Sequence, residues 1–257
     1  VPSGILPQMT QGLGIEDTQV GFLVGIYALA SAIFAIPLIS MTLAVNRKTL
    51  LLILLAGFAL SNIVVGMSSS YYLIVAMRIL GGICAGILWP MIGAYGAALV
   101  TEELQGRAIT IIMAGNTFGV SLGLPFMTYI GTHLGWRTEF ILLGALGALI
   151  ALVAAKFLPS VPGEKLTQSN SPIAMLKIPQ VWIVLVLTFL SVVAHYSTYT
   201  YITLLVETLD FQGGISLALL IFGIGSVISV VLSARVIDAH LRGLIVAMLA
   251  AGAVAML

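Results

Sequence analysis

One histidine and three tyrosines lie within the apolar stretch VVAHYSTYTYITLL, residues 192–205. On a helix of 3.6 residues per turn, His195 and Tyr199 lie one turn apart on the same face. His195 follows Pro179 by about 15 residues, which at 1.5 Å per residue places it roughly in the middle of a membrane. An ionisable group at that depth is costly in lipid and should face a bundle interior or a watery cavity.

The chemistry available to this face is proton exchange and polar binding. Histidine changes its charge near neutral pH, and the tyrosines offer hydroxyl groups and flat rings that suit a sugar or an aromatic ligand. We therefore predict that His195 and Tyr199 bind a substrate or a coupling proton. The alternative is a structural histidine that is hydrogen-bonded to a neighbouring helix.

Further polar or aromatic candidates lie in other apolar segments. Arg78 stays charged, so we expect it to hold backbone carbonyls or a substrate oxygen rather than carry a proton. Its alternatives are a clamp between helices or a snorkelling side chain. Trp89 and Asn116 are candidates for substrate contact, with Asn62 a weaker one, although a neighbouring helix can also satisfy a buried amide. All nine carboxylates fall in loops or near helix ends, so none is expected mid-membrane.

The elements that must position these residues are membrane-spanning helices. The chain is 60% hydrophobic and 7% charged, whereas a soluble domain carries roughly 25% charged residues. Apolar runs of about 20 residues recur along it, each long enough to cross a bilayer. We predict an all-α, polytopic membrane helix bundle with an eighth span beginning near 242. The seven spans before it are predicted at 18–45, 49–69, 71–100, 107–133, 136–158, 180–206 and 214–238.

Both ends of the chain indicate a piece of a longer protein. It begins with Val1, and it closes on LIVAMLAAGAVAML inside an apolar run. We expect Cys84 to be a small packing residue. No P-loop, metal-ligand cluster or nucleophile elbow occurs, so we expect no cofactor, no metal, no nucleic-acid partner and no enzyme activity. An intramembrane enzyme that uses His195 would need a second catalytic group at the same depth.

The longest hydrophilic connection divides the chain. Its Pro, Gly, Ser and Asn content is typical of a flexible link, so we predict a bundle at 1–158, a linker at 159–179 and the start of a second bundle at 180–257. Eight of the ten Lys and Arg residues fall on one side if the spans alternate. The positive-inside rule places that side, and the linker, in the cytoplasm.

Several stretches resemble signatures of the major facilitator superfamily, a fold of two pseudo-repeated six-helix halves. They are the turn ISMTLAVNRKTLL at 39–51, LIVAMRILGGICAG at 73–86 and GNTFGVSLGLPFMTYIG at 115–131. Together with GWRTEF and AHYSTYTYI, the third is similar to the twelve-helix drug:proton antiporter branch, and within it to sugar efflux transporters and arabinose or purine-nucleoside exporters. By this resemblance the chain holds the end of helix 1 to helix 6, then helices 7, 8 and part of 9.

The resemblance implies a charged gate on the inward side. Arg47 and Lys48 stand at its basic pair, whereas Leu43 replaces the usual aspartate, which puts the gate of the first half in doubt. The second-half repeat SARVIDAHLRG keeps Asp238 and Arg242 at the acidic and basic positions.

A stripe of small residues predicts close helix packing. Gly115, Gly119 and Gly123 follow one another at i, i+4 and i+8, a spacing that lets helix backbones approach. Pro125 should disturb the hydrogen-bond ladder that follows and allow a bend.

These observations predict a secondary active transporter that exports a small polar solute, such as a sugar, or a drug. Proton antiport with alternating access would drive the export. Its partners would be the lipid bilayer, the solute and protons. We expect a monomer in a cell membrane, the bacterial inner membrane by the resemblance. The alternative is a non-transporting receptor or structural subunit on the same fold.

Overall fold

The computed structural model describes residues 6–164, 176–200, 208, 212 and 214–255. Every regular element in these ranges is helical, which confirms the predicted all-α bundle. In chain order the elements are α1 (Leu6–Leu13), α2 (Asp17–Thr42), α3 (Arg47–Met67), α4 (Tyr71–Ala97), the 3₁₀ turn η2 (Glu102–Leu104), α5 (Gln105–Phe118), the π-helical turn η3 (Gly119–Gly123), α6 (Leu124–Leu134), α7 (Trp136–Phe157), α9 (Pro179–Thr200) and α11 (Gly214–Ala255).

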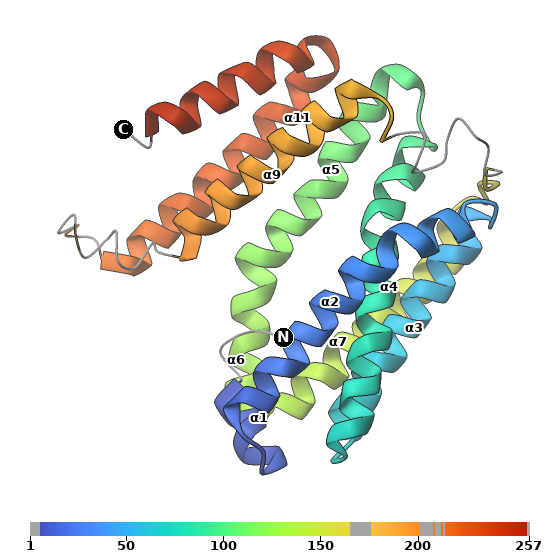
Figure 1. The fold of residues 1–257 in the computed structure, drawn as a ribbon, viewed down its shortest axis with the longest axis vertical. Helices are drawn as coiled ribbons and strands as arrows, with labels where there is room; N and C mark the ends of the chain where they lie inside the picture. The colour runs from blue at the N-terminus through green and yellow to red at the C-terminus, as the bar shows by residue number, and fades with distance from the viewer. Residues whose placement is uncertain (1–5, 165–175, 201–207, 209–211, 213, 256–257) are drawn as a thin grey trace.

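Four of these helices are long and apolar enough to cross a membrane, namely α2, α3, α4 and α7. They match four predicted spans to within a few residues at each end. The predicted span 107–133 is also continuous, because α5, η3 and α6 follow one another without a break. The spans predicted at 214–238 and from 242 lie within one helical range, α11, whose direction reverses inside that range (Figure 1).

Turns between helices are fixed by local backbone chemistry. The Asn46 side chain accepts hydrogen bonds from the backbone N–H groups of Lys48 and Thr49 and so caps the start of α3. At the opposite end of the bundle, Gly135 joins α6 directly to α7 with a φ of +90°. Glycine adopts this conformation without the steric cost that other residues incur.

Two apolar clusters hold helices α1, α2, α3, α4 and α7 together. One cluster joins α3, α4 and α7, from Leu50 to Ala154. The other joins α1, α2, α3, α4 and α7 at the far end, around Trp136 and Phe140. The extensive contacts of α3 with α7 and of α2 with α4 agree with this division.

Helix α4 packs closely against α2 because glycine removes the intervening side chains. A Cβ atom added at Gly82 would collide with the backbone oxygen of Tyr27, and one added at Gly86 would lie 2.6 Å from that of Ser31. Real Cβ atoms do not approach backbone oxygen this closely, so both positions require glycine. Small residues of this kind set the distance between membrane helices.

The chain that follows α7 returns to the turn between α2 and α3. The backbone N–H of Arg47 donates to the oxygen of Val161 over 2.8 Å, and that of Glu164 donates to the oxygen of Leu43 over 2.8 Å. The Tyr95 hydroxyl donates to the oxygen of Pro159 over 2.5 Å. We call this end of the molecule the linker end. It carries Arg47, Lys156 and the beginning of α5.

Pro125 is accompanied by the expected disturbance of the helix. Proline lacks an N–H group, and its ring clashes with the carbonyl four residues earlier. The π-helical turn Gly119–Gly123 lies at that point in the chain.

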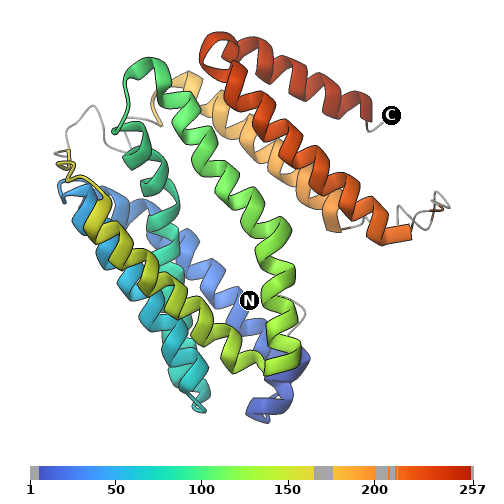
Figure 2. The ribbon, with the colours of Figure 1, turned by 180° about the vertical axis from the view of Figure 1, so that it is seen from behind.

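The close packing expected at the glycine stripe is not observed. A Cβ atom added at Gly115, Gly119 or Gly123 would meet no atom within 4 Å in the described part of the chain. The reason is position along the helix, since the α5 contact with Gly96 of α4 lies at Ile112, before the stripe, and α5 contacts α11 through another face. Figure 2 shows α5 and α11 side by side from behind. The stripe therefore does not act as a packing groove here.

Two single-methyl variants on α4 test the close approach of α4 and α2. We expect Gly86→Ala to lower the free energy of unfolding by about 1–3 kcal/mol, because the new methyl group must displace the α2 backbone. The matched control is Gly93→Ala, where an added Cβ meets nothing within 4 Å. It should leave stability unchanged or raise it by up to about 1 kcal/mol. Thermal unfolding in detergent measures both, and equal midpoints would contradict the packing argument.

Candidate functional site

One face of α4 runs from a contact with α2 to a contact with α5, and its middle section is open. Gly82, Gly86, Trp89, Gly93 and Gly96 follow at spacings of four, three, four and three residues, so they share this face. The first two pack against α2, and the last meets a side chain of α5. Between them Trp89 is 55% exposed and Gly93 has open space in front of it.

Asn116 borders the same open section from α5. Ile112 is the α5 side chain that would touch a Cβ atom at Gly96, and Asn116 lies one turn further along α5, so it faces α4 as well. The Asn116 side chain is exposed. Trp89 lies about 10 Å from Gly96 along α4, and Asn116 lies about 6 Å from Ile112 along α5. Since the two helices run in opposite directions, both side chains lie on the same side of the Gly96–Ile112 contact.

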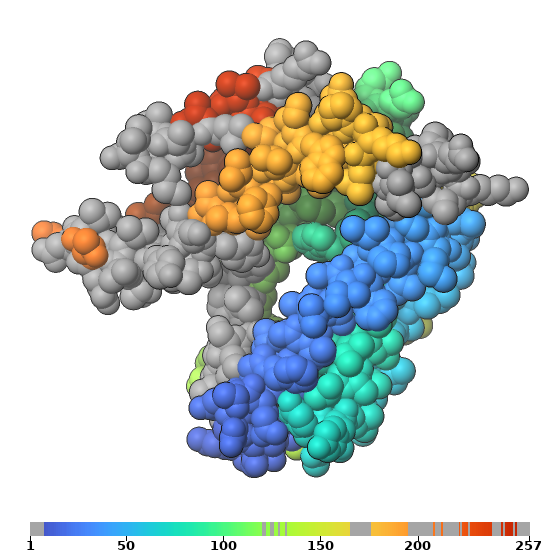
Figure 3. Space-filling model, viewed as in Figure 1, coloured from blue at the N-terminus to red at the C-terminus, as the bar shows by residue number. Residues whose placement is uncertain are grey.

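Figure 3 shows a hollow between α2 and α9, with the helices that carry Trp89 and Asn116 behind it. We call this space the central hollow. An indole ring and an amide can together bind a small polar ligand, because the ring covers an apolar or sugar face and the amide both donates and accepts hydrogen bonds. Of the predicted site residues, Trp89 and Asn116 are the two that helix geometry places beside the open section of the α4 face, one on α4 and one on α5.

The predicted site residue Arg78 lies elsewhere, inside the packing of the first half. It is only 3% exposed, and its guanidinium carbon lies 5.0 Å from the centre of the Tyr27 ring and 4.9 Å from that of Phe140. Its Nη2 atom donates to the Asn62 side-chain oxygen over 3.4 Å. The partners of Arg78 thus come from α2, α3 and α7.

This arrangement favours a structural role for Arg78. A guanidinium between two aromatic rings is stabilised by cation–π attraction, which is strongest where water is excluded. Asn62 is 2% exposed and also donates to the backbone oxygen of Phe58 over 2.8 Å. The suggestion that Asn62 faces a cavity is therefore wrong. Arg78 precedes Trp89 by about 16 Å along α4, so the two do not meet at one site.

His195 and Tyr199 lie on α9, which borders the central hollow in Figure 3. Their side chains fall outside the described part of the structure, so their part in the site stays a prediction. Thr188 and Ser191 share the predicted face with His195, and both are exposed.

The basic pair at the α2–α3 turn belongs to the linker end. Arg47 lines a small cavity of about 160 Å³ between α2, α3 and α4, and the backbone of this turn is bonded to residues 158–164. The side chains of Asp238 and Arg242 are not described, so a gate that joins the two turns stays a prediction.

Glu139 is a buried acid, and its burial was not predicted from the sequence. It lies in the first turn of α7, as expected, yet it is fully buried, and neither carboxylate oxygen has a hydrogen-bond partner among the described residues. A usable signal was present in the sequence. Trp136, Phe140, Gly144 and Gly147 form one face at helical spacing, and Glu139 is placed beside it.

A comparison with protein families agrees with this helical architecture. Residues 1–257 match the family model described as Major Facilitator Superfamily. The match covers the whole chain, including the parts of α4, α5 and α9 that surround the central hollow.

The orphaned carboxyl group of Glu139 gives a stability prediction. We expect Glu139→Met to raise the free energy of unfolding by about 1–3 kcal/mol, because methionine has a similar size and removes two buried acceptors that lack donors. Glu103→Met, at an exposed position, is the matched control and should change it by no more than about 0.5 kcal/mol. A clear loss of stability in Glu139→Met, measured by thermal unfolding in detergent, would show that the carboxyl group has a stabilising partner.

Proposed function

The chain belongs to the major facilitator superfamily, a family of membrane transporters, and from this premise we propose that it exports a small polar solute by proton antiport. A sugar, or a drug, is the proposed class of solute. Two halves would rock around a central site in alternating access, as in other transporters that are built from repeats. We propose 1–158 and 180–257 as parts of these halves, with 159–179 as a cytoplasmic linker in a bacterial inner membrane.

The observation that carries this proposal is the open section of the α4 face. Trp89 lies on this section and is 55% exposed, and by its helix position Asn116 borders the same section from α5. Polar groups within membrane helices are rare and tend to face a pathway or a partner. Both residues lie about 12 to 17 Å from the linker end of their helices, the depth at which such transporters hold a solute.

Proton coupling is assigned to α9. The described membrane helices place no carboxylate beside Trp89 and Asn116, since Glu139 lies at the opposite end of the bundle from the linker. His195 is the predicted proton carrier because it titrates near neutral pH, and Tyr199 would bind the solute beside it. Arg78 would support the first half from within rather than touch the solute.

The basic end would supply the gate. Arg47 and Lys48 from the first half and Asp238 and Arg242 from the second are the proposed charged groups. The π-helical turn Gly119–Gly123 before Pro125 would serve as a bend in the helix that lines the hollow. The open glycine stripe leaves room for such a movement. We propose that the protein works as a monomer.

Substitutions in the central hollow test the solute site. In proteoliposomes that contain the intact protein, we expect Trp89→Ala and Asn116→Ala each to raise the half-saturating solute concentration about tenfold, which corresponds to about 1.4 kcal/mol of binding free energy. Solute counterflow measures this, with candidate sugars and drugs tried in turn. Trp182→Ala is the matched control, because Trp182 is similarly exposed at 53% but lies at the start of α9. Equal loss in all three variants would argue against the hollow.

His195→Ala separates coupling from binding. We expect it to abolish efflux that is driven by a pH gradient, because the proton carrier is gone, and to keep counterflow, which needs no net proton movement. A variant that retains normal gradient-driven flux would remove His195 from the mechanism.

A further inference from the structure

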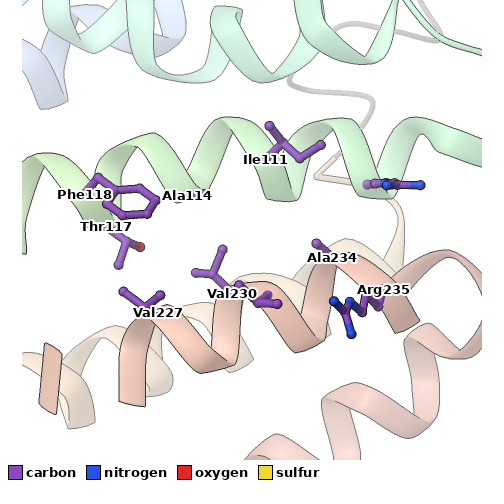
Figure 4. Close-up of a pocket in the computed structure, with 10 residues that line it drawn as sticks. Ile111, Ala114, Thr117, Phe118, Val227, Val230, Ala234 and Arg235 are labelled. Carbon is purple, nitrogen blue, oxygen red and sulfur yellow. The ribbon is translucent and has the colours of Figure 1, made fainter. Parts of the chain in front are cut away.

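A slot separate from the central hollow lies between α5 and α11. It has a volume of about 260 Å³ and is lined by two arginines, one threonine and seven apolar side chains. Figure 4 shows Thr117, Phe118 and Val227 at one end of the slot and Ala234 and Arg235 at the other. The two helices run in opposite directions here, because Arg107 near the start of α5 faces Arg235, and Phe118 at the end of α5 faces the earlier residue Val227 of α11. We call this space the α5–α11 slot.

The slot has the length of one leaflet of a bilayer. From Arg107 to Phe118 the α5 helix rises by about 16 Å, and half of a hydrocarbon core of roughly 30 Å is about 15 Å. Arg107 lies in the first turns of α5, at the linker end, where an interface with lipid headgroups is expected. The far end closes on Phe118 near the midplane. Ile111, Phe118 and Val231 are exposed along it, so an apolar chain has surface to cover.

Charge is concentrated at the interfacial end of the slot. Among the residues that the structure describes, Arg107 and Arg235 are the charged side chains that line it. Glu102 and Glu103 are exposed in the turn before α5 and do not line it. Two guanidinium groups at the end of an apolar slot suit a phosphate that is attached to a hydrocarbon chain, since arginine binds phosphate oxygens in a bidentate manner. Basic pockets between membrane helices on the cytoplasmic side bind lipids of this class.

We propose that the α5–α11 slot binds an anionic phospholipid from the leaflet at the linker end. One acyl chain would fill the slot, and the phosphate would lie between Arg107 and Arg235. Because α5 and α11 come from the two sides of the linker, this lipid would bridge the two parts of the chain and stabilise their contact. Lipid binding does not depend on which solute the protein carries, or on whether it carries one.

Competition between lipids tests the headgroup part. The purified protein is mixed with phosphatidylglycerol and phosphatidylcholine in detergent, and the lipid it retains is measured by native mass spectrometry. We expect a preference for phosphatidylglycerol that falls about fivefold to tenfold in Arg107→Gln/Arg235→Gln. Lys156→Gln removes a basic residue at the same end but outside the slot, and it should keep the preference. An equal loss in Lys156→Gln would reduce the effect to general surface charge and overturn the site.

A second variant tests the apolar part and does not require removal of the arginines. Val230→Phe should fill the slot and lower phosphatidylglycerol retention about tenfold, while size-exclusion elution stays that of the unaltered protein. Inorganic phosphate added alone distinguishes the two sources of the anion. It should not displace the lipid at millimolar concentrations. Displacement by phosphate, or full retention in Val230→Phe, would show a simple anion site or none, and either result would overturn the lipid proposal.

Discussion

The arrangement of much of this molecule depends on the close contact between the backbones of α4 and α2. Gly82 and Gly86 have no side chains, so the backbone of α4 can lie directly against the backbone of α2 at these positions. No other residue type fits there. Further along α4, at Gly96, the same face contacts α5 instead of α2. The section between these two contacts has no helix to cover it. Trp89 is therefore exposed as a consequence of where its neighbours are packed, and a solute pathway becomes possible.

Two buried ionisable side chains in the first half have different surroundings. Arg78 lies between two aromatic rings and reaches the Asn62 amide, so its charge has partners inside the bundle. Glu139 is buried at the start of α7 without a hydrogen-bond partner among the described residues. A permanently charged guanidinium can be accommodated by rings and an amide, whereas a carboxyl group needs hydrogen-bond donors, which none of the described residues supplies to Glu139. The same set of helices therefore supplies partners to the Arg78 guanidinium but, among the described residues, no hydrogen-bond donor to the Glu139 carboxyl group.

The sequence was informative where the physics is local or strongly periodic. Apolar runs predicted the membrane helices to within a few residues. Pro125 predicted a disturbance of the helix, and the π-helical turn lies just before it. Neighbour identity was harder to predict, because apolar helix faces resemble one another. For this reason the sequence predicts close packing at the glycine stripe that begins with Gly115, whereas the structure leaves the stripe open. The sequence likewise predicts Asn62 as a weaker candidate for substrate contact, whereas in the structure it is hydrogen-bonded to Arg78. Burial of Glu139 depends on how α7 packs against other helices, which no single segment reveals.

The hydrogen bonds between residues 158–164 and the α2–α3 turn bear on how movement would be transmitted. Since Val161 and Glu164 are bonded to that turn through backbone atoms, this stretch is mechanically part of the first half. Any rigid rotation of that half would carry it along, together with Arg47. A pivot between the two halves would then not fall within residues 158–164, although α7 ends at Phe157. A spectroscopic label on Ser160 would consequently report the orientation of the first half alone.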